Sequence, residues 1–142
     1  MTESNVTIVL ASIDSSATIE RSLRGFADEL AGRGRIIVVD ASRNRIAATC
    51  LGDVQVLNRP SGTLAPVLWR DGLRESTTEF VAFSTAQMVP RRGWFSELMR
   101  TIQWSGSAGV GGPMVAVATA VGRDSELPTR AVTWTLRVVL FR

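Results

Sequence analysis

The sequence contains no lysine, no histidine and no tyrosine, and it has a single cysteine, Cys50. Without histidine, the chain has no imidazole that could serve as a general base, a nucleophile or a zinc ligand. Without lysine and tyrosine, it also lacks a Schiff-base amine and a phenolic acid. Any chemistry must therefore come from carboxylates, hydroxyls, amides, arginine and one thiol.

Other absences narrow the class of protein further. One cysteine cannot form an intramolecular disulfide, which favours a reducing, cytoplasmic setting. The N-terminal sequence MTESNV lacks the basic and apolar regions of a signal peptide, and no apolar run approaches the ~20 residues that span a bilayer. All 16 basic residues are arginine, but they are scattered and the net charge is only +3, so no nucleic-acid partner is expected.

Apolar, strand-like runs alternate with amphipathic segments along the 142 residues, a length that suits one domain. Strands are expected at 6–11, 36–40, 54–57 and 80–83, with a fifth within 106–117, and helices at 19–30, 63–76 and 94–102. The alternation predicts an α/β fold with an open, largely parallel sheet and helices on both faces. Ligands of such sheets bind beyond the carboxyl ends of the strands, here 12–14, 40–42, 58–60 and 84–87.

The end of the sequence has a different pattern. Apolar and polar residues alternate over 132–140, which is typical of a half-buried strand. The alternative is an amphipathic surface segment whose arginines, Arg130, Arg137 and Arg142, contact a membrane peripherally. No turn or cap residue precedes the last residue, which indicates a truncated domain.

The order of these segments resembles the nucleotide-binding half of family 2 glycosyltransferases, which have the GT-A fold. The resemblance covers roughly 5–115, with 116–142 as a tail, and rests on the segments VTIVLASIDSSATIERSLRGF, RIIVVDAS, VQVLNRPSGTLAPVLWRDGLRESTTEFVAFSTAQMVPRRGWFSELM and AGVGGPM. It implies a single Rossmann-like domain, 1–142, that binds a nucleotide-sugar, and a transferase that moves the sugar to an acceptor hydroxyl with inversion. The alternative function is a non-catalytic nucleotide-binding or interaction module, degenerate or truncated.

The resemblance assigns a nucleotide-sugar site residue by residue. Ser12 and Asp14 lie in the turn after the first strand, which packs on the base and ribose in the family. Asp40 and Ser42 match the end of the second strand, where an aspartate reads the uracil or ribose. A carboxylate suits that role because it can accept two hydrogen bonds. Arg70 matches the arginine of an Ala-Arg-Asn-x-Gly-like helix that faces the donor diphosphate.

Structural roles remain open for the same residues. Asp40 could instead fix a turn or pair with Arg43 or Arg45, and Arg70 could lie on a solvated helix face. Trp94, in a segment that matches Pro-x-x-Gly-Trp, is expected to be a core anchor.

The sequence departs from the family at the end of the fourth strand, where the family carries Asp-x-Asp. Those carboxylates hold Mg²⁺ or Mn²⁺ against the donor diphosphate. Thr85 and Gln87 occupy the two positions here, and neither carries a charge. Three alternatives follow: weak metal binding through these side chains, neutralisation of the diphosphate by Arg70, Arg91 or Arg92, or loss of donor chemistry. A divalent cation is therefore a doubtful cofactor.

The acceptor and the general base are not assigned by the resemblance, because the family's base lies beyond the matched region. Asp124 and Glu126 are late carboxylates, but nothing aligns them with that role. Cys50 has no histidine to activate it and is expected to be structural.

Overall fold

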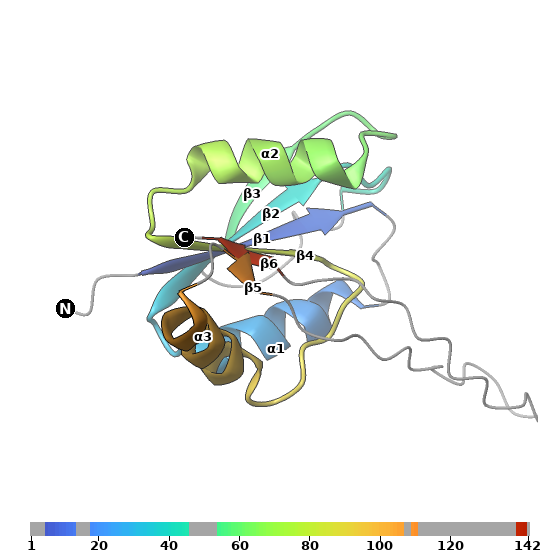
Figure 1. Ribbon diagram of the computed structural model, residues 1–142. Coiled ribbons are helices and arrows are strands. Elements are labelled where there is room, and N and C mark those ends of the chain that lie inside the picture. The colour runs from blue at the N-terminus through green and yellow to red at the C-terminus, as the bar shows by residue number, and fades with distance from the viewer. Residues whose placement is uncertain (1–4, 14–17, 46–53, 107–108, 111–138, 142) are drawn as a thin grey trace, which may run out of the picture.

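The computed structural model describes residues 5–13, 18–45, 54–106, 109–110 and 139–141 (Figure 1). The elements within these ranges are, in chain order, β1 (Val6–Ser12), α1 (Ile19–Leu30), β2 (Gly34–Asp40), β3 (Val54–Asn58), α2 (Ala65–Glu75), β4 (Phe80–Thr85), α3 (Trp94–Ser105), β5 (Gly109–Val110) and β6 (Val139–Phe141). The strands and helices expected from the apolar patterns are confirmed, with small shifts at their ends. Of the tail pattern at 132–140, only the last part falls within the described residues, as the start of β6.

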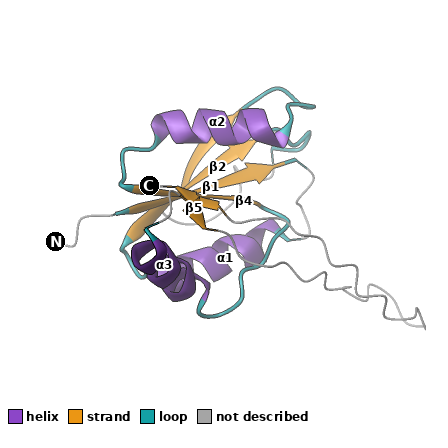
Figure 2. Ribbon diagram, in the orientation of Figure 1, coloured by secondary structure: helices purple, strands orange, loops and turns teal. Residues whose placement is uncertain are grey.

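The strands form one sheet in the order β3-β2-β1-β4-β6-β5. Strands β3, β2, β1 and β4 are parallel, and β6 runs antiparallel to β4 and β5. Helix α2 covers one face of the sheet, and α1 and α3 cover the other (Figures 1 and 2). This architecture confirms the predicted α/β fold with a largely parallel sheet. Within the described residues, no helix is both long enough and apolar enough to cross a membrane.

Both faces of β1 are buried along its whole length, so its successive side chains enter two separate cores. Ile8 and Leu10 pack with α1 and α3, where Phe26 and Leu98 belong to the same cluster. Val9 and Ala11 point the other way, into the cluster under α2. An uncharged apolar run is therefore what this position requires, because a polar side chain on either face would be buried without water.

Trp94, the first residue of α3, packs against the core under α1. Its ring meets Phe26 edge to face, with the ring centroids 5.2 Å apart. The expectation that Trp94 anchors the core is confirmed.

Helix α2 lies unusually close to the sheet at Gly72. A Cβ atom at this position would lie 2.2 Å from Cγ1 of Val9 and 3.2 Å from Cγ2 of Val39. Val9 and Val39 are fully buried, so neither can move aside without disturbing the packing of β1 and β2. Glycine at this position therefore sets the distance between the helix and the sheet.

Gly72→Ala should destabilise the protein by about 1–3 kcal/mol, because the added methyl group overpacks this contact. On helix propensity alone, the same change would stabilise by up to about 1 kcal/mol, so the sign of the effect is diagnostic. Urea unfolding would measure it, with Leu73→Ala at the exposed neighbouring position as the control. A Gly72→Ala variant as stable as the wild type would contradict the close contact.

Helices α1 and α3 are joined by the side chain of Glu29. Its Oε1 accepts a hydrogen bond from the main-chain N–H of Gly93, and its Oε2 accepts one from Phe95, 3.0 Å away. The first N–H groups of a helix have no partner within the helix, and they attract negative charge. Glu29 therefore caps α3 from a neighbouring helix, in place of a local capping side chain.

Glu29→Ala should cost about 1.5–3 kcal/mol of unfolding free energy, because it removes the charged acceptor of two main-chain donors. Glu20→Ala is a matched control in the same helix. Glu20 forms an exposed ion pair with Arg24 at 3.2 Å, and such pairs contribute about 0.3–0.5 kcal/mol. Equal losses in the two variants, measured by thermal or urea unfolding, would refute the capping role.

Candidate functional site

The carboxyl ends of the parallel strands lie side by side at one edge of the sheet. Ser12 of β1 is in register with Asp40 of β2, and Asp40 is in register with Asn58 of β3. On the other side of β1, Ala11 pairs with Thr85 of β4. The fold thus brings together residues that are separated in the sequence, as predicted for the ligand-binding edge.

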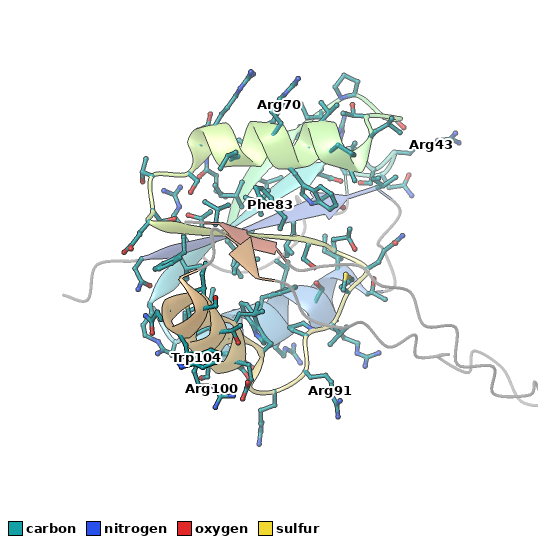
Figure 3. All side chains as sticks on the ribbon, viewed as in Figure 1. Arg43, Arg70, Phe83, Arg91, Arg100 and Trp104 are labelled. Carbon is teal, nitrogen blue, oxygen red and sulfur yellow. The ribbon has the colours of Figure 1, made fainter. Side chains whose placement is uncertain are left out.

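Asp40 is completely buried at this edge. Its Oδ1 accepts a hydrogen bond from the main-chain N–H of Ser42 at 2.9 Å, which fixes the carboxylate in a tight turn. Its main-chain oxygen accepts hydrogen bonds from the N–H of Arg59 at 2.8 Å and from Nη1 of Arg45 at 3.0 Å. The expected turn is therefore present, and Arg45 contacts the carbonyl group of Asp40. Arg43 is exposed on this side of the sheet (Figure 3).

Arg45 joins the ends of β2 and β3. Besides the oxygen of Asp40, its Nη1 donates to the main-chain oxygen of Arg59 at 2.6 Å. Its backbone has φ +50°, a left-handed conformation that is uncommon for a residue other than glycine. Such a conformation costs free energy and persists where surrounding contacts hold it, as these two hydrogen bonds do.

The hydroxyl group of Ser12 is the unusual polar group of the site. Ser12 is completely buried, and its Oγ has no hydrogen-bond partner within the part of the chain that the structure describes. A buried hydroxyl without a partner is destabilising, so proteins rarely retain one without a reason. Because Ser12 is the residue beside Asp40 in the sheet register, its Oγ is a candidate ligand contact.

The main chain after β4 is held firmly between β1 and the start of α1. Ala86, which is completely buried, donates its N–H to the oxygen of Ala11 at 2.9 Å. The oxygen of Ala86 accepts a hydrogen bond from Oγ1 of Thr18 at 3.0 Å. Thr85 and Gln87 flank this fixed residue. The two residues that the resemblance assigns to the Asp-x-Asp positions therefore flank a residue held by two hydrogen bonds.

The side chains at these positions do not fit a Mg²⁺ or Mn²⁺ site. Thr85 and Gln87 offer a hydroxyl and an amide oxygen without charge, whereas hard divalent cations are bound through carboxylates. Among the described residues, no group of three or more His, Cys, Asp or Glu side chains could hold a metal ion. The departure from the family's metal ligands at Thr85 and Gln87 stays a prediction.

Arg70 lies on the outer side of α2 (Figure 3). Its Nε and Nη2 donate to Oδ1 of Asp71 at 3.1 and 3.0 Å, and its side chain is 55% exposed. Asp71 also accepts a hydrogen bond from Nε of Arg59 at 2.7 Å, which ties α2 to the end of β3. This three-residue cluster was not predicted from the sequence, although an aspartate in the middle of a helix is a signal for such a contact. A role of Arg70 toward a diphosphate stays a prediction.

Several other predicted residues lie outside the described residues. They are Asp14, assigned to the nucleotide, together with Cys50, Asp124 and Glu126.

The hydrogen bond from Arg59, followed by that from Arg70, lowers the pKa of Asp71 below its ordinary value. A carboxylate with a lowered pKa stabilises the folded state above the pKa of the unfolded chain, about 3.9. That stabilisation disappears as the pH falls through the lower pKa of the folded state.

Asp71→Asn should therefore lower the melting temperature at pH 7, because Arg59 and Arg70 lose their charged acceptor. The difference from the wild type should shrink as the pH falls below about 4. Thermal unfolding at a series of pH values would measure it, with Asp28→Asn, at an exposed position of α1, as the control for loss of one charge. A difference that stays constant down to pH 2 would contradict the lowered pKa.

Comparison with known proteins points to one class of enzyme. No family model matches the sequence. The chain is 32% identical to the pre-mycofactocin glycosyltransferase of Mycobacterium tuberculosis, in each of two strains, over 67% of this chain and 20% of that protein. The chain thus spans about a fifth of the length of these curated relatives.

Solved structures show the same fold. Residues 1–349 of S. aureus TarS superpose with a TM-score of 0.67 at 14% identity, covering 96% of this chain and 46% of that one. The mannosyltransferase PcManGT from Pyrobaculum calidifontis, in complex with GDP-Man and Mn²⁺, superposes with a TM-score of 0.54 at 21% identity, covering 77% and 34%. The chain is therefore similar in sequence to part of a glycosyltransferase, and it shares the α/β fold of these solved structures.

Proposed function

We propose that this chain is the donor-binding part of a family 2 glycosyltransferase and that 1–142 form a single nucleotide-sugar-binding domain. The observation that carries the proposal is the pair formed by Ser12 and Asp40. Both are completely buried and adjacent in the sheet register, and the Ser12 hydroxyl has no described partner. A ligand that offers hydroxyl or N–H donors to a carboxylate, and an oxygen acceptor to a hydroxyl, would satisfy both groups.

A nucleoside has these groups, since its ribose carries neighbouring hydroxyls and its base carries N–H and carbonyl groups. In the proposed site, Asp40 accepts hydrogen bonds from the nucleoside. Its orientation is already fixed by the N–H of Ser42, so no ordering cost falls on binding. Ser12 donates to a nucleoside oxygen. Asp14 and Arg70, the latter on the outer side of α2 (Figure 3), are assigned to the same site by the resemblance.

The proposed reaction is transfer of the sugar with inversion. The oxygen of an acceptor hydroxyl attacks the anomeric carbon, and a new C–O bond forms as the bond to the nucleoside diphosphate breaks. The nucleoside diphosphate leaves with the bonding electron pair. The hydroxyl proton passes to a carboxylate base, which the resemblance places beyond the matched region. We place this function in the cytoplasm, consistent with the single cysteine.

A second candidate function is nucleotide binding without catalysis. The uncharged residues Thr85 and Gln87, at the positions of the family's metal ligands, favour it. Both candidates use the same nucleoside contacts, and they differ in whether sugar is transferred. Incubating the protein with radiolabelled UDP- and GDP-sugars separates them, because a transferase without another acceptor slowly transfers the sugar to water and releases the nucleoside diphosphate, whereas a binding module does not.

Ser12→Ala should weaken the binding of UDP or GDP by roughly two- to tenfold, the value of one neutral hydrogen bond. Folding should not suffer, because Ser12 Oγ makes no described hydrogen bond that the substitution would break. Isothermal titration calorimetry would measure the affinities.

Ser22→Ala is a matched control. Ser22 is also completely buried, and its Oγ likewise has no partner among the described residues, but it belongs to helix α1 and not to a strand of the sheet. Asp40→Asn removes the charged acceptor and should cost roughly 10- to 100-fold in affinity. Equal affinities of the Ser12 and Ser22 variants, or absence of nucleotide binding by the wild type, would refute the proposed site.

A further inference from the structure

We infer that the proposed donor site binds its nucleoside diphosphate without a divalent cation, and that arginines at the ends of β2 and β3 supply the compensating charge. This inference rests on the proposed function and names the electrostatic partner of the diphosphate. At the end of β4 the fold is like that of the mannosyltransferase, but Thr85 and Gln87 stand at the positions where the family has carboxylate metal ligands.

The main chain at the end of β4 has the order that a metal site would need. Ala86 is held on both sides by hydrogen bonds to Ala11 and Thr18, and the N–H of Met88 donates to the oxygen of Thr85 at 3.1 Å. The residues on either side of Ala86 are therefore fixed in space. What distinguishes this edge from a metal site is the absence of charge at positions 85 and 87.

The carboxylates described near β2 and β3 are already committed to protein partners. Asp40 is completely buried, and its Oδ1 binds the N–H of Ser42. Asp71 binds one arginine through each oxygen, Arg59 through Oδ2 and Arg70 through Oδ1. A metal ion would have to displace these partners to gain a carboxylate ligand.

Positive charge is in excess at the same place. Among the described residues, four arginines lie near Asp40 and Asp71: Arg43, Arg45, Arg59 and Arg70. Asp14, which the resemblance adds to the site, lies outside the described residues. Arginine outnumbers aspartate here even with Asp14 counted, and each phosphate of a nucleotide-sugar carries one negative charge that arginine can compensate.

Two of these arginines are held in place before any ligand binds. Arg45 uses Nη1 for the main-chain oxygens of Asp40 and Arg59, and Arg59 uses Nε for Asp71 and Nη1 for the oxygen of Asn58 at 2.8 Å. A guanidinium group has five N–H donors, so donors remain on both side chains. Fixed guanidinium groups bind phosphate with little loss of conformational entropy.

The test is calorimetric titration of the wild-type protein with UDP and with GDP, in buffer containing either Mn²⁺ or EDTA. The affinity for the nucleotide that binds should agree within about twofold between the two buffers. In Thr85→Asp/Gln87→Asp, which restores two carboxylates on the ordered main chain, binding should become roughly tenfold or more weaker in EDTA than in Mn²⁺. Thr85→Asn/Gln87→Asn, with neutral side chains of the same size as aspartate, should stay independent of Mn²⁺.

Arg43→Gln tests the origin of the compensating charge. Arg43 is exposed, so folding should be unaffected, and affinity in EDTA should fall roughly three- to tenfold at low salt. Arg74→Gln is the control. Arg74 is an exposed arginine in the last turn of α2, at the end of that helix that precedes β4 and not at the end that follows β3. Equal affinities of these two variants would overturn the assignment of the charge to this edge.

The outcomes separate the inference from the proposed function. Wild-type binding that weakens tenfold or more in EDTA overturns the inference and leaves the proposed function standing. Absence of binding in both buffers overturns the proposed function. In that case the metal question is decided by NMR, through paramagnetic broadening of the amide signals of residues 84–88 by Mn²⁺. Broadening in the wild type overturns metal independence, and broadening only in Thr85→Asp/Gln87→Asp supports it.

Discussion

The burial of both faces of β1 is the constraint on which the rest of the structure depends. A strand with a core on each side needs a helix layer on each side, and short parallel strands connected by helices provide both layers. The same arrangement directs the carboxyl ends of β1, β2, β3 and β4 to one edge. The site is thus a geometric consequence of how the core is covered, and Gly72 keeps α2 close enough to cover it.

Burial also explains the chemistry of that edge. Strands that are largely apolar on both faces carry most of their polar groups near their ends, so the sheet register brings the polar side chains at the strand ends together. Ser12 and Asp40 meet in this way, completely buried at the boundary between core and solvent. A buried carboxyl group needs hydrogen-bond partners, and the turn at Ser42 supplies one from the main chain. The carboxylate is consequently oriented before a ligand arrives.

The fold was predictable from the sequence because apolar runs and helical periodicity are local patterns that reflect which side chains are buried. The positions of Asp40 and Thr85 followed, since strand ends can be placed within a residue or two. The contacts of Arg59 with Asp71, and the Ser12 hydroxyl without a partner, depend on side chains brought together by tertiary packing. Arg70 illustrates the limit, because its place on α2 was predictable but its hydrogen bonds to the adjacent Asp71 were not.

The position of the main chain at the end of β4 does not depend on the charge of the side chains there. The main chain at Ala86 is fixed by hydrogen bonds to Ala11 and Thr18, and neither bond involves the side chain of residue 85 or 87. Diphosphate recognition requires positive charge near the strand ends, but it does not require that the charge be a metal ion. In the proposed site, arginines anchored on main-chain oxygens and on Asp71 supply this charge from the neighbouring strands. A chain whose basic residues are all arginine can meet it with bidentate donors at every such position.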